Sequence, residues 1–205
     1  IAVLEARAPR QPAADAGPGL RVFAIAPAGR AILEACGGWN GLPPGMAAPY
    51  ERMRVWRAGS TPFGAGSIGF DAAESGGSDL GHIVDHDWLR LGLWNALLEP
   101  RGGEVHLLTG SSPAGLEAGP GATTVRLADG EALQTRLLVG ADGADSWVRA
   151  QLQLPTTERD YGQLAVVGHV SSERPHERTA WQCFMPAGPV ALLVLEDGRS
   201  CIVWS

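Results

Sequence analysis

Residues 137–149 read LLVGADGADSWVR, an apolar run that stops at Gly140, Asp142 and Gly143 and resumes as a helix-like segment ending at Arg149. A continuous apolar run is typical of a strand buried in a parallel sheet. Such a strand, leading through small residues into a helix, presents backbone N–H groups at the carboxyl edge of the sheet, where phosphates and riboses bind. The stretch therefore predicts a cofactor edge. The plainer alternative is an ordinary strand-to-helix turn capped by Asp142.

The flanking sequence alternates strand-and-helix segments with segments that predict antiparallel strands. Residues 1–5 (IAVLE) form a short apolar run ending in an acid, which favours a buried parallel strand. The Asp-Gly centre of residues 128–131 predicts a hairpin. The other expected strands are residues 53–56, 68–70, 104–108, 123–127, 133–140, 164–170, 179–184, 190–195 and 201–205.

Two longer helices are expected. The first covers residues 27–38, with Pro27 at its first position and Gly37 as its stop. The second follows a short strand within residues 80–99 and is capped in the region of Asp85–Asp87. The residues expected to face inward are Leu33 and Cys36 on the first helix, and Leu89, Leu93, Leu97, Trp94 and Leu98 on the second.

The composition excludes several classes of protein. Sixteen Lys and Arg against 22 Asp and Glu give a formal net charge of −6, and no basic cluster is present, so nucleic acid is not an expected partner. Charges, Gly or Pro interrupt every apolar run well short of ~18 residues, so no membrane span is expected. The three cysteines lack CxxC spacing, which favours a reducing, cytoplasmic setting. Because residue 1 is Ile and both ends fall within β-rich runs, we expect the chain to lack both ends of a longer protein.

Two further motifs are given no functional role. Gly64, Gly66 and Gly69 match the GxGxxG pattern, but no buried strand precedes them and no amphipathic helix follows, so we interpret them as a glycine-rich loop. His82 and His86 have HxxxH spacing, but no third ligand converges on them and no metal is expected.

The segment GADGADSWVR is similar to the Asp-Gly motif of the single-component flavoprotein aromatic hydroxylases. The other segments narrow this resemblance, since VLEAR, LRVFAIAP, ILEACGGWN and LGHIVDHDWLRLGLW are followed in order by YGQLAVVGHV, PHERTAWQCFMPAGPVALL and IVWS. Over nearly its whole length the chain resembles the ubiquinone-biosynthesis FAD-dependent hydroxylase family. The GxGxxG motif of that family would precede Ile1, and its second flavin motif would follow Ser205.

The resemblance implies cofactor-binding roles for three residues outside the opening stretch. Glu5 matches the acid that holds the adenosine ribose, and Arg21 matches a flavin-contacting Arg whose guanidinium can grip a diphosphate. Arg90 falls where the family has a Gln or Arg directed at the flavin. The plainer interpretations are a charged strand end for Glu5, a solvated loop charge for Arg21 and an exposed helix residue for Arg90.

Asp142, Gly143 and Arg149 match the Asp-Gly motif itself, which in the family lies beside FAD and the nicotinamide nucleotide. Trp181 and Trp204 lie on expected strands of the second layer. Most of the tryptophans are expected in the core, but these two could wall a pocket for an aromatic ring, which the family would place on a sheet facing the flavin.

By resemblance, the fold class is α/β, with a Rossmann-like FAD-binding domain interleaved with a mostly antiparallel substrate sheet, as in p-hydroxybenzoate hydroxylase. Residues 1–48 and 81–154 are assigned to the FAD-binding domain, and residues 49–80 and 155–205 to the substrate domain.

The resemblance implies FAD-dependent hydroxylation of the aromatic ring of a polyprenyl phenol or quinol in ubiquinone biosynthesis, with NAD(P)H and O2 as co-substrates. No catalytic acid or base is assigned, because the cofactor supplies the reactivity. The polyprenyl tail implies peripheral contact with the inner face of a membrane or with a biosynthetic complex. The alternatives are a related hydroxylase of a soluble phenol or secondary metabolite, and a flavin-free binding or scaffold protein with the same fold.

Overall fold

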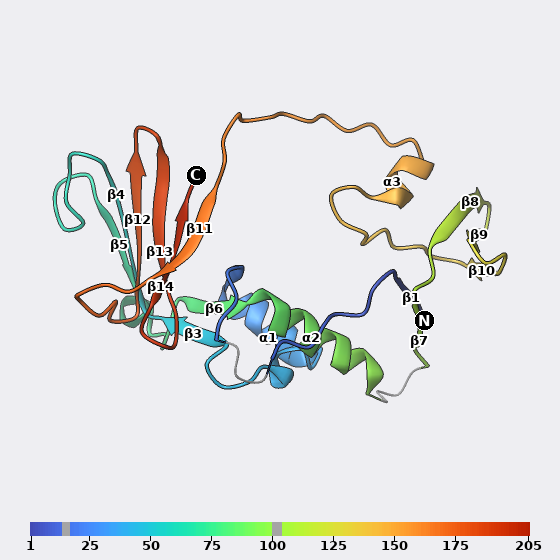
Figure 1. The fold of residues 1–205 in the computed structure, drawn as a ribbon, viewed down its shortest axis with the longest axis horizontal. Helices are drawn as coiled ribbons and strands as arrows, with labels where there is room; N and C mark the ends of the chain where they lie inside the picture. The colour runs from blue at the N-terminus through green and yellow to red at the C-terminus, as the bar shows by residue number, and fades with distance from the viewer. Residues whose placement is uncertain (14–16, 100–103) are drawn as a thin grey trace. The chain divides into compact units, whose positions relative to one another are not determined.

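The chain divides into two compact units, each assembled from two separate stretches of sequence (Figure 1). The computed structural model describes residues 1–13, 17–99 and 104–205. The first unit comprises residues 1–8 and 100–161, and the second comprises residues 9–99 and 162–205.

The described part of the first unit holds two small sheets and a short helix, namely β1 (Ala2–Glu5), β7 (His106–Thr109), β8 (Pro113–Gly119), β9 (Ala122–Leu127), β10 (Ala132–Thr135) and α3 (Trp147–Gln151). Strands β1 and β7 pair in parallel, with Val3 opposite Leu107, which confirms the parallel strand expected at residues 1–5. Strands β8, β9 and β10 form an antiparallel meander. The expected Asp-Gly hairpin joins β9 to β10, with Gly130 at a φ of 93°.

A six-stranded sheet dominates the second unit, in the order β11 (Val166–Val170), β14 (Ser200–Trp204), β13 (Gly188–Val194), β12 (Thr179–Met185), β4 (Arg52–Arg57) and β5 (Ile68–Asp71). Its neighbours pair antiparallel except β12 and β4, which run parallel. Each of these strands was expected from the sequence. The parallel pair joins the two stretches of chain that make up this unit. Strands from both stretches therefore form the one sheet.

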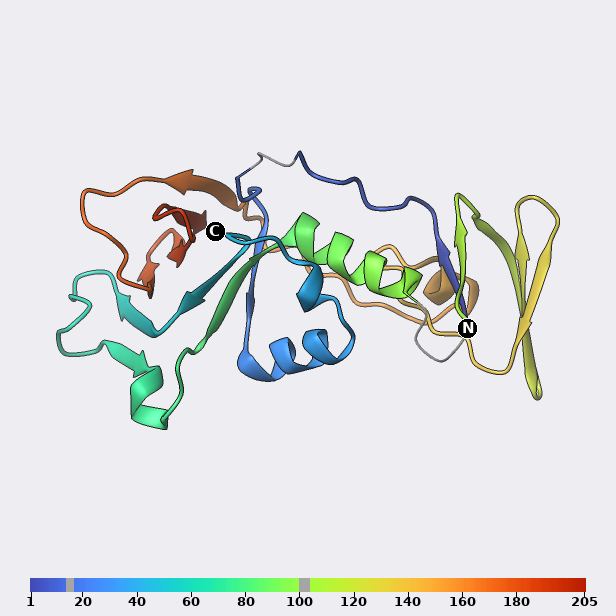
Figure 2. The same ribbon diagram turned by 90° about the horizontal axis from the view of Figure 1, so that it is seen from below.

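The rest of the second unit comprises β2 (Val22–Ile25), α1 (Pro27–Ala35), η1 (Trp39–Gly41), β3 (Ala47–Tyr50), η2 (Ala72–Ser75), β6 (Gly81–Asp85) and α2 (His86–Leu98). Strand β6 lies between β2 and β3, and both longer helices contact it (Figure 2). The hydrophobic core joins this small sheet to the large one through Ile83, Val194 and Cys201, each at most 2% exposed.

The two helices confirm their expected termini and correct some of their expected faces. Pro27 begins α1 and Gly37 follows it with a φ of 78°. Cys36, the C-cap of α1, is exposed rather than inward, and none of the residues of α1 is fully buried. On α2 the buried residues are Trp88, Leu89 and Gly92, whereas Leu97 and Leu98 in its last turn are 38% and 62% exposed.

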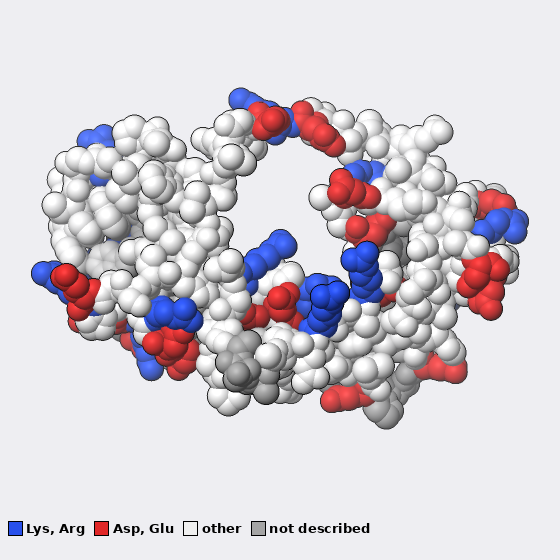
Figure 3. All heavy atoms as spheres, viewed as in Figure 1, with Lys and Arg blue, Asp and Glu red and all other residues white. Residues whose placement is uncertain are grey.

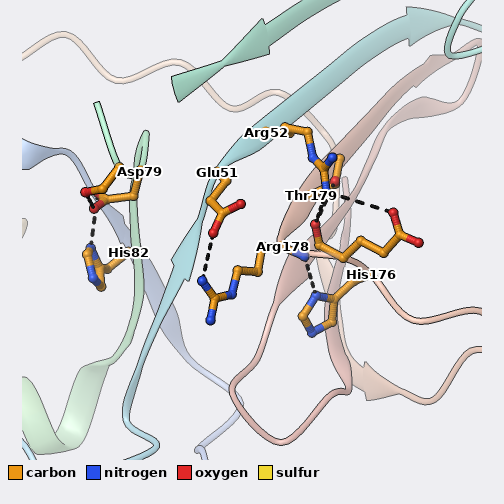
Figure 4. Close-up of polar contacts among 9 residues, drawn as sticks. Glu51, Arg52, Asp79, His82, His176, Arg178 and Thr179 are labelled. Carbon is orange, nitrogen blue, oxygen red and sulfur yellow. Dashed lines mark hydrogen bonds and ion pairs between the residues drawn. The ribbon is translucent and has the colours of Figure 1, made fainter. Parts of the chain in front are cut away.

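The start of β12 is held by a tight turn with an uncommon backbone. Glu177 and Arg178 have φ values of 48° and 54°, and the Thr179 N–H donates to the His176 carbonyl at 2.9 Å. Residues other than Gly, Asn and Asp adopt this left-handed backbone conformation at a cost of about 1–2 kcal/mol per residue. The Arg178 guanidinium donates to Glu51 at 2.7 Å (Figure 4), so a contact with the β3–β4 junction offsets part of that strain.

Helix α2 contacts η1 through glycines that let the two backbones meet. A Cβ on Gly92 would lie 2.3 Å from the Gly38 carbonyl oxygen, and a Cβ on Gly41 would lie 3.0 Å from the Gly92 Cα. Because these neighbours are backbone atoms, they cannot turn aside as a flexible side chain would. Gly92 is therefore required by packing even though glycine weakens a helix interior.

We expect Gly92→Ala to destabilise the protein by about 1–3 kcal/mol, although alanine is the better helix former, because the added methyl group forces α2 away from η1. Urea unfolding of the purified protein measures the change. The control is Asn95→Ala at an exposed position of the same helix, where only helix propensity changes and stability should rise by at most about 0.7 kcal/mol. Equal or greater stability of Gly92→Ala would contradict the close contact.

Candidate functional site

The Asp-Gly stretch of the first unit folds into a turn that is organised around the Asp142 carboxylate. One carboxylate oxygen accepts from the Ser146 hydroxyl at 2.6 Å, and the other accepts from the Val148 N–H at 3.0 Å. Ser146 is also the N-cap of α3, since its Oγ accepts from the Arg149 N–H at 3.1 Å. Asp142 and Ser146 thus satisfy two of the backbone donors at the start of α3.

These contacts give Asp142 an electrostatic environment that favours the charged form. The Ser146 hydroxyl, and after it the Val148 N–H, lower the pKa of the Asp142 carboxyl below its ordinary value of 3.8. Asp142 is therefore an anion at neutral pH. It is also exposed, so its oxygens retain acceptor capacity toward a hydroxyl group from solvent or from a ligand.

Two glycines bare the backbone on either side of this carboxylate. Gly143 has a φ of 87°, which disfavours any other residue, and the space where its Cβ would stand is open. A Cβ on Gly140 would lie 3.1 Å from the Val148 side chain. Arg149 donates from its guanidinium to the Ala144 carbonyl, which closes the turn from the other end. A flat ligand group can approach the backbone at Gly143 without meeting a side chain.

The expected buried strand leading into this turn is wrong over residues 137–140. The strand β10 ends at Thr135, and Leu137 and Val139 are 75% and 70% exposed. The Thr135 hydroxyl donates to the Leu137 carbonyl and accepts from the Leu137 N–H, so it occupies the backbone groups that a ladder would use. In the described residues no neighbouring strand pairs with this run.

Glu5 lies in the same unit, at the carboxyl end of β1, beside its parallel neighbour β7. Its side chain is half-buried and accepts from the Arg7 N–H at 3.1 Å. The placement at the carboxyl end of a parallel strand is the one that a ribose-binding acid needs.

Arg21 and Arg90 lie in the second unit. The Arg21 guanidinium is exposed and stands 5.5 Å from the centre of the Phe23 ring. Arg90 is exposed on α2, four residues after the helix begins at His86. The Arg21 carbonyl accepts from the His86 N–H at 3.0 Å, so the segment that carries Arg21 meets the first residue of the helix that carries Arg90. The structure thus brings these two elements together.

The two tryptophans project from one face of the six-stranded sheet. Trp181 pairs with Leu192 and Trp204 with Val190, two residues along the same strand, so their side chains share a face. Trp181 meets the rings of Trp56 and Phe63 edge to face, with ring centres 6.2 Å and 6.1 Å apart.

Trp204 is 43% exposed and lies at an open depression in the same sheet, separate from the aromatic cluster around Trp181. The residues lining the depression are Leu164, Val166, Ala187, Trp204 and Ser205. Residues other than Lys, Arg, Asp and Glu make up most of the surface over the six-stranded sheet in the view of Figure 3.

Sequence reasoning missed the polar cluster around His82, which is only 7% exposed. Its Nε2 lies 3.3 Å from the Arg30 guanidinium, and its Nδ1 lies 3.6 Å from Asp79 (Figure 4). Burial lowers the pKa of His82. His86 instead contacts Asp87 at 2.8 Å. Within residues 1–13, 17–99 and 104–205, no three His, Cys, Asp or Glu side chains gather as a metal site would require.

Asp85, for which the sequence predicts only a helix cap, makes a second contact that sequence reasoning missed. Its carboxylate also accepts from the Gly19 N–H at 2.6 Å, across 66 positions of sequence. No local pattern signals that contact. None of the helices in the described part of the chain combines the length and apolar character that a membrane span requires.

Comparison with known proteins connects this geometry to a family. No protein-family model matches the chain. It is 34% identical over 194 residues to the ubiquinone biosynthesis monooxygenase COQ6 of Danio rerio, covering 90% of this chain and 39% of that relative. It is 31% identical over its whole length to the 3-demethoxyubiquinol 3-hydroxylase of Escherichia coli (strain K12), of which it covers 50%. The resemblance seen in the sequence is confirmed, and the chain spans about two fifths to one half of the length of these relatives.

The fold has a counterpart among solved structures. The structure of pqsL, a probable FAD-dependent monooxygenase from Pseudomonas aeruginosa, matches 98% of this chain with a TM-score of 0.73 at 21% identity, and the match covers 52% of that protein. The expected fold class, an α/β flavoprotein hydroxylase fold with antiparallel sheets, is confirmed. The roles of the individual site residues stay predictions.

We expect Ser146→Ala to raise the pKa of Asp142 toward its ordinary value, because the hydroxyl is the largest cause of the depression. NMR titration of the Asp142 carboxyl carbon measures this shift. Loss of the N-cap should also destabilise the protein by about 1 kcal/mol. The control is Ser172→Ala, whose hydroxyl donates only to the Arg174 carbonyl on an exposed loop.

The pH dependence of this contribution has a definite sign. A carboxyl whose pKa is lowered by folding contributes stability that is fully present above its unfolded value, here 3.8, and that is lost as the pH falls through the folded pKa. The stability difference between wild type and Ser146→Ala should therefore shrink as the pH is lowered below about 3.8. A difference that stays constant over that range would show that Ser146 acts as a cap alone.

Proposed function

We propose, from its homology with ubiquinone-biosynthesis monooxygenases, that this chain forms part of an FAD-dependent monooxygenase that hydroxylates the aromatic ring of a polyprenyl phenol or quinol. NAD(P)H and O2 are the co-substrates of the proposed reaction. The observation that carries the proposal is the Asp142 turn, because an ionised carboxylate, a bare glycine backbone and a capped helix start coincide there. The substrate and the activity are proposals for the whole protein, since the chain spans at most half of these relatives.

The residues of the first unit fit a flavin nucleotide. Glu5, half-buried at the end of a parallel strand, presents a carboxylate that can accept from the hydroxyls of a ribose. The exposed Asp142 carboxylate and the open backbone at Gly143 suit a polar, flat group that approaches closely. Arg149 secures the turn through the Ala144 carbonyl and holds its guanidinium beside it.

The second unit carries two exposed cations of its own. Arg21 and Arg90 are both exposed, and a guanidinium holds a diphosphate or an electron-rich carbonyl through paired N–H donors. We assign Arg21 and Arg90 to the flavin on the strength of their match to the family pattern and their exposure.

When bound, FAD supplies the electron transfer from NAD(P)H and the activation of O2 that ring hydroxylation requires. The residues of this chain bind and orient the flavin and the substrate. Asp142 stays ionised at neutral pH and keeps its turn in one conformation, so it presents a fixed acceptor rather than an acid. On the face of the sheet that carries Trp181 and Trp204, the aromatic rings offer stacking contacts to a substrate ring, and the depression at Trp204 offers apolar contacts to an isoprenoid tail. Arg54 lies on the same face, opposite Trp181, so this surface also carries a charge.

A polyprenyl substrate resides in lipid, so we also propose that the protein is cytoplasmic and contacts the inner face of a membrane, or a complex that presents the substrate. Support for peripheral contact comes from the chemistry of the substrate and from the exposed apolar side chains of Leu154, Tyr161 and Leu164, which are 56%, 76% and 91% exposed.

The experiment compares the two Asp-Gly pairs of the first unit in the whole protein. Asp142→Ala should weaken FAD binding about tenfold or more, equivalent to about 1.4 kcal/mol, because it removes a charged acceptor and loosens the turn. Asp129→Ala, in the hairpin between β9 and β10, is the matched control and should change the affinity less than about twofold, because a surface change far from the ligand has little effect. Flavin fluorescence titration gives both dissociation constants.

Failure of the wild-type protein to bind FAD would overturn the proposal and favour a flavin-free binding protein. If FAD binds, NAD(P)H oxidation is measured with a polyprenyl phenol and with the same phenol lacking its tail. Product formation from the tailed ring supports ubiquinone biosynthesis. A preference for the soluble phenol would instead identify a related hydroxylase.

A further inference from the structure

Asp85 is a buried carboxylate at the junction of β6 and α2. Only 3% of the residue is exposed, and each of its two carboxylate oxygens accepts from backbone N–H groups. One oxygen accepts from the N–H groups of Asp87 and Trp88, both at 2.9 Å, and thereby caps α2. The other accepts from the Gly19 N–H at 2.6 Å. One side chain therefore joins a helix start to a distant loop.

The backbone at Gly19 lies close to the Asp85 carboxylate, with little room for a side chain. A Cβ on Gly19 would lie 3.1 Å from the Asp85 carboxylate oxygen, so a larger residue at this position pushes against the acceptor. Two backbone contacts continue the junction, since the His86 N–H donates to the Arg21 carbonyl and Val22 pairs with Asp85 in the β2–β6 ladder. Three contacts thus hold residues 19–22 against the Asp85–His86 junction.

The two elements that Asp85 joins carry the two arginines assigned to the flavin. Arg21 lies two residues after Gly19, and Arg90 lies one helical turn after His86. The junction at Asp85 fixes the relative positions of the two backbone segments that carry Arg21 and Arg90.

We propose that Asp85 is a positioning residue for the flavin nucleotide: it fixes the Arg21 loop to the start of α2 and so presents Arg21 and Arg90 together to one anionic ligand. This inference rests on the proposed function. The free energy of binding is greatest when the binding groups are ordered before the ligand arrives, because less conformational entropy is lost on association. Asp85 supplies that order without contacting the ligand.

Asp85→Asn separates the two contacts of this side chain. Asparagine caps helices as well as aspartate does, so its amide oxygen can keep the Asp87 and Trp88 bonds. Its amide nitrogen is a donor and cannot accept from the Gly19 N–H. The substitution should release the loop and leave the helix cap. Gly19→Ala disturbs the same contact from the loop side, and remains informative if Asp85→Asn folds poorly.

The test measures amide hydrogen exchange and FAD affinity in the whole protein. In Asp85→Asn the amides of residues 19–21 should exchange faster while those of residues 87 and 88 keep their protection, and the dissociation constant for FAD should rise about tenfold. Asp71→Asn is the matched control, because Asp71 caps η2 through the Ala73 N–H and joins no distant loop.

A double substitution distinguishes positioning from general support of the fold. If Asp85 acts through Arg21, Asp85→Asn should cost little further FAD affinity in a protein that already carries Arg21→Gln. A full additional tenfold loss in that background would overturn the inference, and so would a released loop with unchanged affinity. Failure of the wild-type protein to bind FAD would instead overturn the proposed function on which the inference rests.

Discussion

Hydrogen bonds from backbone N–H groups to side-chain carboxylates organise one candidate segment in each of the two units. The start of a helix leaves donors without partners inside the helix, and the chain satisfies them with Asp85 in one unit and with Asp142 and Ser146 in the other. In each case the carboxylate also accepts from a group outside the helix ladder, Gly19 or the Ser146 hydroxyl. One carboxylate in each unit therefore both caps a helix and fixes a second part of the chain.

Much of the fold could be predicted because its signals are local. The period-two strands of the large sheet, the Asp-Gly hairpin, Pro27 at the start of α1 and the Asp85 cap of α2 depend on a few adjacent residues, and each is present in the structure. The strands β2, β3 and β8 were not predicted as strands. They contain small residues, Pro or Gly, and become strands only through partners elsewhere in the chain.

The candidate site was predictable to a lesser degree. The Asp142 turn could be located because strand-like sequence, glycine and a capped helix lie within a dozen residues, although the strand itself is replaced by an exposed run at residues 137–140. The contact between Asp85 and Gly19 could not be found, because 66 residues separate the partners and neither lies in a recognisable motif. The buried contact of His82 with Arg30, across 52 positions, was missed for the same reason.

The parallel pairing of β12 with β4, clamped by the Arg178–Glu51 ion pair, also constrains the order in which the protein can fold. Strands β12, β13 and β14 form a meander that closes only short loops, and β11 pairs with β14 within the same last forty or so residues. Strand β12 gains its second neighbour only when it pairs with β4, which follows Glu51. Glu51 is separated in sequence from its partner Arg178 by 127 positions. The chain loses conformational entropy in closing that long loop before the contacts between β4 and β12 form. The loop includes residues 100–161 of the first unit. We therefore expect completion of the large sheet to be a late, non-local step that leaves the edge of β12 open to pairing with other chains until β4 covers it.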